Sequence, residues 1–452
     1  MLYRFVQLSD IHFGQERDGT LVKHEDVRMH LLTDAASFAD ARGPANLVIV
    51  VGDIAYSGKT DEYKIAEEWL DRLTVAVKCD ETDVCVVPGN HDCDRTQIRS
   101  VCRTVHRGIR AGTPKSAYAE LEDMAKGPEE ANPLLPKLKA YRAFAASYDS
   151  DFRSIASPSW TKNLALGAGI TLQLVGMNSV QVCDNEDKPA SMILGNAQYI
   201  FPEEPHIIHA VIMHHPLDWY MDKADAKPYL RNRARIVMVG HEHIPDISKT
   251  VDVLENQWLD IYSGATNPPE DAASYQFAYN WIEVQLEEKA EGYVLGVSVF
   301  PRVWIPEQTR FAADVQRLAG RESARFDISC PRTGPSIEAT TSGTRTRTMV
   351  EAISASGVGP VGETTMNTKD DAAVAKLKFL FWRYLDWQQR LKVLVQADAL
   401  PPSANQPVPQ TMEQVALEAA RQQGKLGAIW DAMMAYVPDT KRQTNPFREP
   451  NS

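Results

Sequence analysis

Apolar runs separated by amphipathic stretches fill the first 270 residues and predict an alternation of strands and helices. The expected strands are 3–9, 46–52, 83–89, 170–179, 206–215, 235–241 and 258–264, and the expected helices are 24–41 and 61–77. Strands separated by helices imply a largely parallel sheet covered by helices. Two later stretches, 277–288 and 292–304, alternate apolar with polar residues, which is typical of antiparallel strands with one solvated face.

The pattern changes at three places along the chain. Residues 94–150 have a helical pattern and are expected to form an insertion over one end of the sheet, within one large domain at 1–330. Residues 331–370 are dense in Thr, Ser and Gly and predict a flexible linker. Residues 371–440 are again helical in pattern and predict a small separate all-α domain, followed by a tail at 441–452.

The bulk composition excludes some classes of protein. A formal net charge of −12 argues against a chain that coats nucleic acid or anionic membrane through bulk charge. No apolar run reaches the roughly 20 residues that a membrane span needs, and the first ten residues are unlike a signal peptide. The six cysteines lack the spacing of a zinc knuckle or a disulfide framework. We therefore expect a cytoplasmic protein with no membrane partner.

Five clusters of polar residues follow directly on predicted strands. They are Asp10 with His12, Asp53, Asn90 with His91 and Asp92, His214 with His215, and His241 with His243. Open α/β sheets bind their ligands at the carboxyl ends of strands. The five clusters are therefore expected to converge on one site.

Carboxylate, imidazole and amide groups together form a set of metal ligands. Such mixed oxygen and nitrogen donors suit Mn²⁺, Fe or Zn²⁺, whereas an all-oxygen set would suggest Mg²⁺ or Ca²⁺. Seven of these ten side chains are the expected ligands. Seven are too many for one tetrahedral ion, but they suffice for two ions about 3.5–4 Å apart if one carboxylate bridges them. We expect two divalent ions, with Mn as the first choice and Fe, Zn or Ni as alternatives.

The series D-x-H, GD, GNHD, H-x-P and GH-x-H resembles the motifs of the calcineurin-like metallophosphoesterase superfamily over roughly residues 1–305, with no core ligand missing. The resemblance implies a four-layer α/β/β/α sandwich, here with a helical insertion and the all-α C-terminal domain. It also implies the metal ligands, namely Asp10, His12 and His243 for one ion, Asn90, His214 and His241 for the other, and Asp53 as the bridge.

His91 and Asp92 are the expected catalytic residues. His91 would touch the substrate and, when protonated, give a proton to the leaving alkoxide. Asp92 would orient His91 through a hydrogen bond to the imidazole; alternatively, it caps the next helix. The nucleophile would be hydroxide generated by the two cations, without a covalent intermediate. Asn178 and His215 are expected beside the substrate, with His215 behind the ligands.

These motifs specify a reaction class rather than a substrate. Four-residue spacing of arginines predicts a basic stripe on a helix that begins beside His91. Its members are Arg95, Arg99, Arg103, Arg107 and, three residues further on, Arg110. Such a stripe would bind the phosphates of nucleic acid or a nucleotide, first of all through Arg95 and Arg99; alternatively, it is a solvated helix face.

We therefore expect a phosphodiesterase that acts on nucleic acid or on nucleotides, including cyclic ones. The alternatives are a phosphomonoesterase or protein phosphatase, and a catalytically inactive scaffold with the same fold. The complete ligand set together with His91 argues against the scaffold.

The C-terminal helices carry a second resemblance. Residues 376–437, with LKFLFWRYLDWQQRLKVLV and RQQGKLGAIWDAMMAYV, are similar to the small effector-associated domains of bacterial conflict and signalling proteins, which resemble death-domain adaptors. This implies a bacterial effector that a protein partner recruits through these helices. The alternative is a plain helical appendage.

Overall fold

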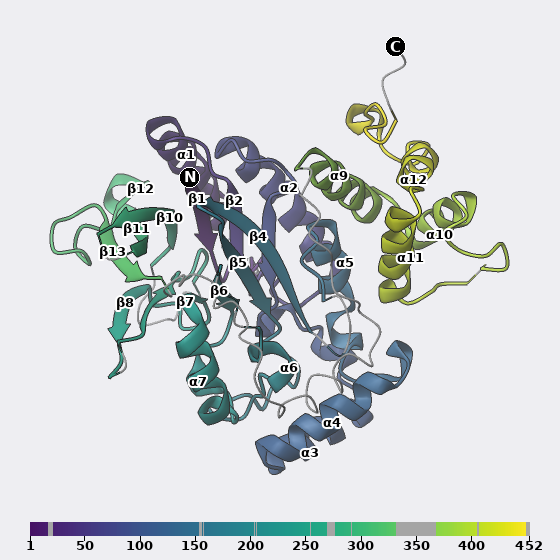
Figure 1. Ribbon diagram of the computed structural model, residues 1–452, viewed down its shortest axis with the longest axis horizontal. Coiled ribbons are helices and arrows are strands. Elements are labelled where there is room, and N and C mark those ends of the chain that lie inside the picture. Colours follow the sequence, from purple (N-terminus) through teal and green to yellow (C-terminus); the bar gives the residue numbers. More distant parts are fainter. Residues whose placement is uncertain are drawn as a thin grey trace, which may run out of the picture.

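Two mixed β-sheets stacked face to face form the centre of the protein (Figure 1). The computed structural model describes residues 1–16, 21–152, 156, 158–202, 204, 206–253, 255–268, 276–290, 292–330, 368–404 and 406–448. The expected linker at 331–370 lies outside the described residues up to residue 367, and its last three residues begin a helix.

The first sheet combines a parallel unit with antiparallel strands. Its strands are β1 (Leu2–Leu8), β2 (Leu47–Val51), β3 (Val84–Val87), β10 (Ala278–Lys289), β11 (Gly292–Ile305), β12 (Arg310–Ala313) and β13 (Ala324–Ser329). The order is β12-β11-β10-β1-β2-β3, with β13 also beside β11. Only β1, β2 and β3 are parallel, so the expectation of a largely parallel sheet is wrong here.

The second sheet has a longer parallel unit. Its strands are β4 (Ser159–Gly167), β5 (Ile170–Met177), β6 (Ile207–Met213), β7 (Ala234–Val239), β8 (Asp246–Val251) and β9 (Gln257–Tyr262), in the order β4-β5-β6-β7-β9-β8. The two edge strands, β4 and β8, pair antiparallel and were not expected from the sequence. They carry many exposed polar residues, which weakens the apolar signal of a strand.

Helices cover the outer faces of both sheets and form the insertion. They are α1 (Leu21–Arg42), α2 (Thr60–Ala76), α3 (Ser100–Ala111), α4 (Pro114–Lys126), α5 (Lys139–Ser147), α6 (Asn196–Tyr199) and α7 (Lys223–Arg233). Short 3₁₀ helices lie at Asn90–Asp92, Arg95–Gln97, Glu129–Ala131, Pro136–Leu138, Leu217–Trp219, Pro306–Gln308 and Asp439–Lys441. The expected α/β/β/α sandwich is confirmed. Within the described residues, no helix is both long and apolar enough to cross a membrane.

The core explains why the central strands read as unbroken apolar runs. Side chains alternate across a strand, so one strand can serve two cores. On β2, Leu47, Ile49 and Val51 belong to the core between the sheets, whereas Val48 and Val50 belong to the core beneath the helices. Both faces are buried, and the carboxyl ends of these strands are thereby held rigidly in place.

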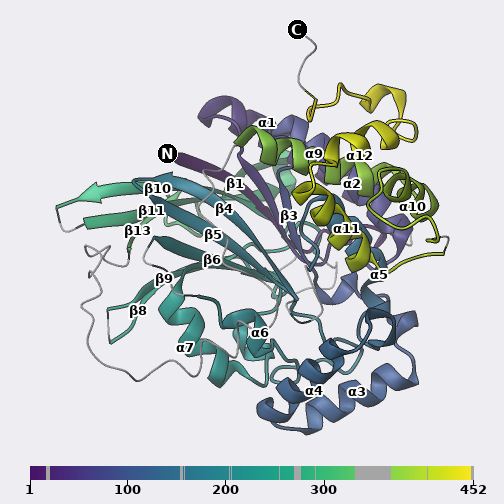
Figure 2. The same ribbon diagram turned by 45° about the vertical axis from the view of Figure 1, so that its right-hand side comes forward.

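The C-terminal helices pack against α2 and α5 in both views (Figures 1 and 2). They are α9 (Thr368–Tyr384), α10 (Trp387–Gln396), α11 (Gln410–Gln422) and α12 (Leu426–Met433). The fully buried ring of Phe379 on α9 lies 6.0 Å from the ring of Tyr148, which follows α5. Gln410 and Gln414 on α11 donate to the carboxylate of Asp151 at 2.8 and 3.0 Å.

Opposite charges line this contact. The guanidinium of Arg383 on α9 lies 3.1 Å from the carboxylate of Glu67 and 3.0 Å from that of Asp71, both on α2. Lys378 pairs with Asp149 at 2.9 Å, and Glu81 accepts from Lys376 and Lys441. The cations come from the C-terminal segment and the carboxylates from the large domain.

Replacing Arg383 by alanine tests this contact. The Arg383 side chain is 5% exposed, and its loss leaves two partly buried carboxylates without a cation. We expect docking of the C-terminal helices to weaken by about 2 kcal/mol, measured as faster hydrogen exchange of the α9 amides. Arg442→Ala, which removes an exposed i,i+3 pair with Asp439, is the control and should leave α9 unchanged. If the α9 amides exchanged equally fast in Arg383→Ala and Arg442→Ala, the ion pairs of Arg383 would not be what holds the C-terminal helices in place.

Candidate metal centre

The structure brings all seven expected metal ligands together at the carboxyl ends of five strands. Three overlapping groups each place their ligand atoms within 4.8 Å of one another. They are Asp10 with His12 and His243, Asp10 with Asp53 and His214, and His214 with His215 and His241. Asn90 joins through its amide oxygen, which lies 3.0 Å from Nδ1 of His241.

Asp53 stands between the two halves of the centre. Its Oδ2 lies 3.2 Å from Nε2 of His12 and 3.3 Å from Nε2 of His214. The carboxylate is 1% exposed. One oxygen thus faces an imidazole from each expected ligand set, which is the position of a bridging carboxylate between two ions.

Backbone carbonyls fix the tautomers of these histidines. Nδ1 of His214 lies 2.7 Å from the carbonyl oxygen of Val51, and Nδ1 of His12 lies 3.4 Å from that of Asn267. A nitrogen facing a carbonyl carries a proton, so in the neutral imidazole the Nε2 lone pair faces Asp53 and is open to a cation. Metal-bound histidines have this arrangement. Nε2 of His214 is buried without a hydrogen-bond partner in the described residues, so the site fits a cation that both groups would bind.

Burial and neighbouring charges both shift the pKa values of residues in the centre. Burial opposes charge on Asp10, but the hydrogen bond from His243 and the charge on His214 lower the pKa of Asp10 to about 2. Burial also opposes charge on His214, yet Asp53 outweighs it and raises the pKa of His214 to about 9. For His241, burial and the nearby His214 lower the pKa to about 4. The buried carboxylates therefore keep their charge, and they hold positive charge beside them.

The backbone is held in an uncommon conformation at most of the ligands. Asp10, His12, Asp53, His241 and His243 have φ angles of 53°, 51°, 52°, 68° and 57°. The left-handed region costs a non-glycine residue about 1 kcal/mol or more and is found preferentially at functional sites. The sharp turns after the strands are what let the side chains point into one centre.

Two glycines make room for these turns. Gly52 has a φ of 84°, and a Cβ there would overlap the imidazole of His214. A Cβ at Gly89 would overlap the carboxylate of Asp53. Any other residue would therefore displace a ligand.

His91 lies at the edge of the centre with its ring fixed by Tyr56. Its Nδ1 lies 2.8 Å from the carbonyl oxygen of Tyr56, and the two rings stack with centroids 5.1 Å apart. His91 also forms a close group with His12 and Asp53. Burial lowers the pKa of His91, and the charge on Asp53 only partly offsets this. The fixed ring leaves Nε2 free for another partner.

The expectation that Asp92 orients the His91 imidazole is wrong. The Asp92 carboxylate instead accepts from the backbone N–H groups of Ala55 at 3.0 Å and Gly89 at 2.9 Å, and from the hydroxyl of Tyr63 at 2.8 Å. Neighbouring residues in a 3₁₀ helix point in different directions, so Asp92 faces back toward the loop after β2. Asp92 therefore binds the loop of Asp53 to the loop of Asn90.

Asn178 and His215 are both buried, and His215 lies among the ligand histidines. Nδ1 of His215 is 3.0 Å from Oγ of Ser179, and its Nε2 is buried with no partner in the described chain. Burial, together with His241 and His214, keeps the pKa of His215 well below its usual value. Asn178 is buried and its Oδ1 accepts from the N–H of Val180 at 3.0 Å.

Sequence reasoning missed two groups that shape the centre. The ring of Trp219 lies 4.3 Å from that of His241, and its Nε1 donates to Glu242 at 3.0 Å. Oγ of Ser9 donates to the carboxylate of Asp10 and to the carbonyl of Val51. Neither belongs to a motif, although Ser9 directly precedes Asp10, which is the one local signal.

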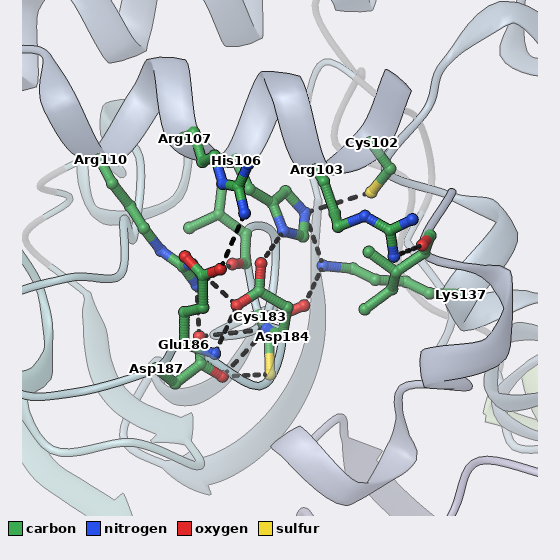
Figure 3. A network of polar contacts seen from close by, with 12 residues as sticks. Cys102, Arg103, His106, Arg107, Arg110, Lys137, Cys183, Asp184, Glu186 and Asp187 are labelled. Carbon is green, nitrogen blue, oxygen red and sulfur yellow. Dashed lines mark hydrogen bonds and ion pairs between the residues drawn. The ribbon is translucent and has the colours of Figure 1, made fainter. Parts of the chain in front are cut away.

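The expected arginine stripe is not continuous. Arg95 lies in a separate 3₁₀ helix, and α3 begins only after Arg99. Arg107 and Arg110 are engaged by carboxylates of the loop after β5 (Figure 3), with Arg110 lying 2.8 Å from Asp184. The alternative of a solvated helix face describes Arg103 and Arg107, which are exposed, but not Arg110, which is partly buried against the loop. Contact of Arg95 and Arg99 with a substrate stays a prediction.

A buried lysine completes this network (Figure 3). Nζ of Lys137 donates to the carbonyls of Gln181 at 2.8 Å and Cys183 at 3.0 Å, and it lies 3.3 Å from Nε2 of His106. Nδ1 of His106 lies 2.7 Å from Asp184. Burial lowers the pKa of His106 to about 4 despite Asp184, so its neutral Nε2 can accept from the lysine. The network joins the insertion to the loop that borders the metal centre.

A two-sheet sandwich with a His/Asp centre at its strand ends is the arrangement expected of a dinuclear metallohydrolase. Residues 3–245, more than half of the chain, match the model of the calcineurin-like phosphoesterases, and the chain belongs to this family. Residues 373–435 match the model of the GTPase-associated adaptor domain, which the C-terminal helices therefore form. The expected family is confirmed, and the expected adaptor likeness is shown in this specific form.

Known relatives are distant. The uncharacterized metallophosphoesterase-like protein YydB of Bacillus subtilis (strain 168) is 23% identical over 279 residues, covering 59% of this chain and 54% of the relative. The chain thus spans about half the length of the curated relative that it matches.

Two solved structures match this chain over much of its length at low identity. Purple acid phosphatase PPD1 from yellow lupin seeds is 11% identical with a TM-score of 0.38, covering 73% of this chain and 54% of that one. The 5'-nucleotidase precursor from Thermus thermophilus is 11% identical with a TM-score of 0.31, covering 71% and 57%.

The corrected role of Asp92 is testable with Asp92→Asn. An amide places an N–H₂ group against N–H donors, so we expect the free energy of unfolding to fall by about 3 kcal/mol, measured by chemical denaturation. Asp61→Asn, whose side chain is 93% exposed, is the control and should change nothing. An unchanged stability with a shifted pH–rate profile would instead restore the role in orienting His91.

Proposed function

We propose that the protein is a dinuclear-metal-dependent phosphodiesterase that acts on nucleic acid or nucleotides. The observation that carries the proposal is the position of the Asp53 carboxylate between the Nε2 atoms of His12 and His214. Bound there, two divalent cations, Mn²⁺ being the proposed pair, would lower the pKa of a water and neutralise charge on the phosphate. Cytoplasmic location is part of the proposal.

The chain's own residues then position the substrate. His91, with Nδ1 held by Tyr56, presents Nε2 toward the centre and would bind a phosphate oxygen or give a proton to the leaving oxygen. His215 offers a second unpartnered Nε2 among the ligand histidines. The Asp92 carboxylate is occupied by hydrogen bonds from Ala55, Gly89 and Tyr63. We therefore assign Asp92 to holding the loop after β2 rather than to proton transfer.

The charges around the centre favour a diester over a monoester. A phosphodiester carries one negative charge, whereas a monoester carries about two at neutral pH. Apart from the ligands, the cation beside His91 is Arg95, which is exposed and has no ion pair in the described chain. Arg107 and Arg110 are neutralised by carboxylates. Arg95 and Arg99 remain free to meet the neighbouring phosphates of a nucleic acid.

We further propose that the adaptor domain brings the enzyme to a protein partner, and that this partner is a GTPase, in a bacterial effector system. The match to a GTPase-associated adaptor domain supports this. Trp387, Met412 and Val415 are exposed apolar residues on α10 and α11. Equal binding of a purified GTPase by the full chain and by Val415→Glu would count against this surface.

The catalytic proposal is tested by two variants with different expected defects. His91→Ala should keep both metals and lower kcat on bis-p-nitrophenyl phosphate by about 10²–10⁴-fold. Asp53→Ala should lose metal, measured by elemental analysis, and with it all activity. Metal content and turnover are measured on the same samples. Parental turnover by His91→Ala would remove His91 from the mechanism, and full metal content in Asp53→Ala would refute the bridge.

The substrate class is tested at the arginines. Arg95→Glu should raise KM for a single-stranded oligonucleotide at least several-fold and less so for bis-p-nitrophenyl phosphate, because only the polymer has further phosphates. Arg107→Glu, at an exposed pair with Glu186, is the matched control and should have no effect. If the enzyme hydrolyses phosphomonoesters faster than any diester in a panel of nucleotides, DNA and RNA, the monoesterase alternative replaces the proposal. Inactivity with every metal would favour the scaffold.

A further inference from the structure

A cavity of about 380 Å³ lies between the insertion and the second sheet, beside the metal centre. It is bordered by α4, by the 3₁₀ helix Pro136–Leu138, by α6 and by the segment that follows β5. Its volume is at the lower end of the range of about 300–1,000 Å³ for small-molecule sites. The family's metal ligands take no part in it.

One side of the cavity is apolar. Leu121 and Met124 on α4 line it together with Leu134, Leu138 and Phe152, the last three of which are nearly fully buried. Among the described lining residues the one charged side chain is Glu122, which is exposed. No lysine or arginine stands among the lining residues that the structure describes, so the described wall offers no cation to a phosphate or carboxylate. This part of the wall suits an uncharged ligand with apolar faces.

Two hydrogen-bond donors in the cavity wall have no partner in the described part of the chain. Oδ1 of Asn178 accepts from the N–H of Val180 at 3.0 Å, and Oδ1 of Asn132 accepts from the N–H of Leu134 at 3.0 Å. These bonds fix the orientation of both amides, which leaves each Nδ2 without a protein partner among the described residues. Asn178 is 4% exposed and Asn132 is 6% exposed, and both line the cavity, so both amino groups are available to an acceptor there.

One acceptor complements these donors. Nε2 of Gln181 donates to the carbonyl of Leu194 at 2.6 Å, which leaves its Oε1 without a partner in the described chain. Gln181 is 9% exposed and lines the same cavity. The described wall therefore offers two donors and one acceptor, and a ligand that used all three would present two acceptors and a donor.

We infer that this cavity binds a nucleobase. A nucleobase is neutral and flat, with apolar faces and an edge of alternating acceptors and donors, which matches both sides of the cavity. The choice of a nucleobase among such heterocycles rests on the proposed function.

The cavity and the metal centre share one short segment as a wall. Asn178 and Gln181 face the cavity, whereas Ser179, between them, lies 3.0 Å from His215. Sγ of Cys183 lies 4.0 Å from the carbonyl oxygen of the ligand residue Asn90. The base belongs either to the substrate or to a second nucleotide, and the shared wall lets either one affect hydrolysis.

Binding is tested with nucleosides, which lack phosphate, on the full chain in the presence of EDTA. Adenosine, guanosine, cytidine and uridine are titrated calorimetrically, with ribose as the blank. We expect at least one to bind saturably to the parent and equally to Ala119→Trp, on the exposed side of α4. Ala125→Trp fills the cavity from the same helix. It should raise the Kd of that nucleoside on the order of tenfold or more, which is about 1.4 kcal/mol of binding free energy.

A second variant distinguishes recognition of the base by its polar groups from simple filling of the cavity. Asn178→Asp keeps Oδ1 for Val180 and replaces the Nδ2 donor by an acceptor, so the order of preference among the four nucleosides should change. The inference is overturned if no nucleoside binds the folded parent. It is also overturned if Ala125→Trp binds the nucleoside as tightly as Ala119→Trp does.

Kinetics distinguish the two sources of the base. If it is part of the substrate, Ala125→Trp raises KM for a nucleotide diester far more than for bis-p-nitrophenyl phosphate. If it is a second nucleotide, the free nucleoside changes kcat for bis-p-nitrophenyl phosphate in the parent and much less in Ala125→Trp. Either result supports the inference. Loss of hydrolysis with every substrate would refute the proposed function and leave the nucleoside titration as an independent result.

Discussion

A buried carboxylate facing two imidazole lone pairs is the constraint on which the rest of the structure depends. Asp53 is almost fully buried, and backbone carbonyls hold the protons of His12 and His214 on the side away from it. Such a cluster of electron-rich atoms is costly unless positive charge lies among them. A proton on His214 supplies it without metal, and two cations would supply it in the enzyme. The left-handed turns at five of the ligands are the backbone's contribution to the same arrangement.

The insertion contacts the residues that follow β3, whereas the adaptor domain packs against α5, which itself contacts β3. The N–H of Asp94 donates to the carbonyl of Lys137 at 2.8 Å, and the N–H of Val86 on β3 donates to Ser150, just after α5. The Lys137 network fixes the insertion against the loop after β5, and the adaptor domain packs against α5. One helix therefore lies between the adaptor and the strand that carries the catalytic loop. A partner that displaced the adaptor would act on that helix first.

The ligands could be predicted from the sequence because their position follows from local order. Each lies directly after an apolar strand, and the strands of an α/β sheet bring their carboxyl ends together. Contacts between distant segments carried no such signal. The direction of the Asp92 carboxylate depends on Ala55 and Tyr63, and the carboxylate partners of the arginines of α3 come from a loop more than seventy residues away. Trp219 reaches His241 only through the fold. The polar edge strands β4 and β8 were missed because their outward faces dilute the apolar pattern.

The most direct measurement is the anomalous scattering of a crystal of the full chain soaked in manganese. The account predicts two peaks about 3.5–4 Å apart, with the Asp53 carboxylate between them, the ligand histidines and Asp10 around the pair, and the Asn90 amide on the side of His241. A single peak, or two ions that the Asp53 carboxylate does not touch, would contradict it.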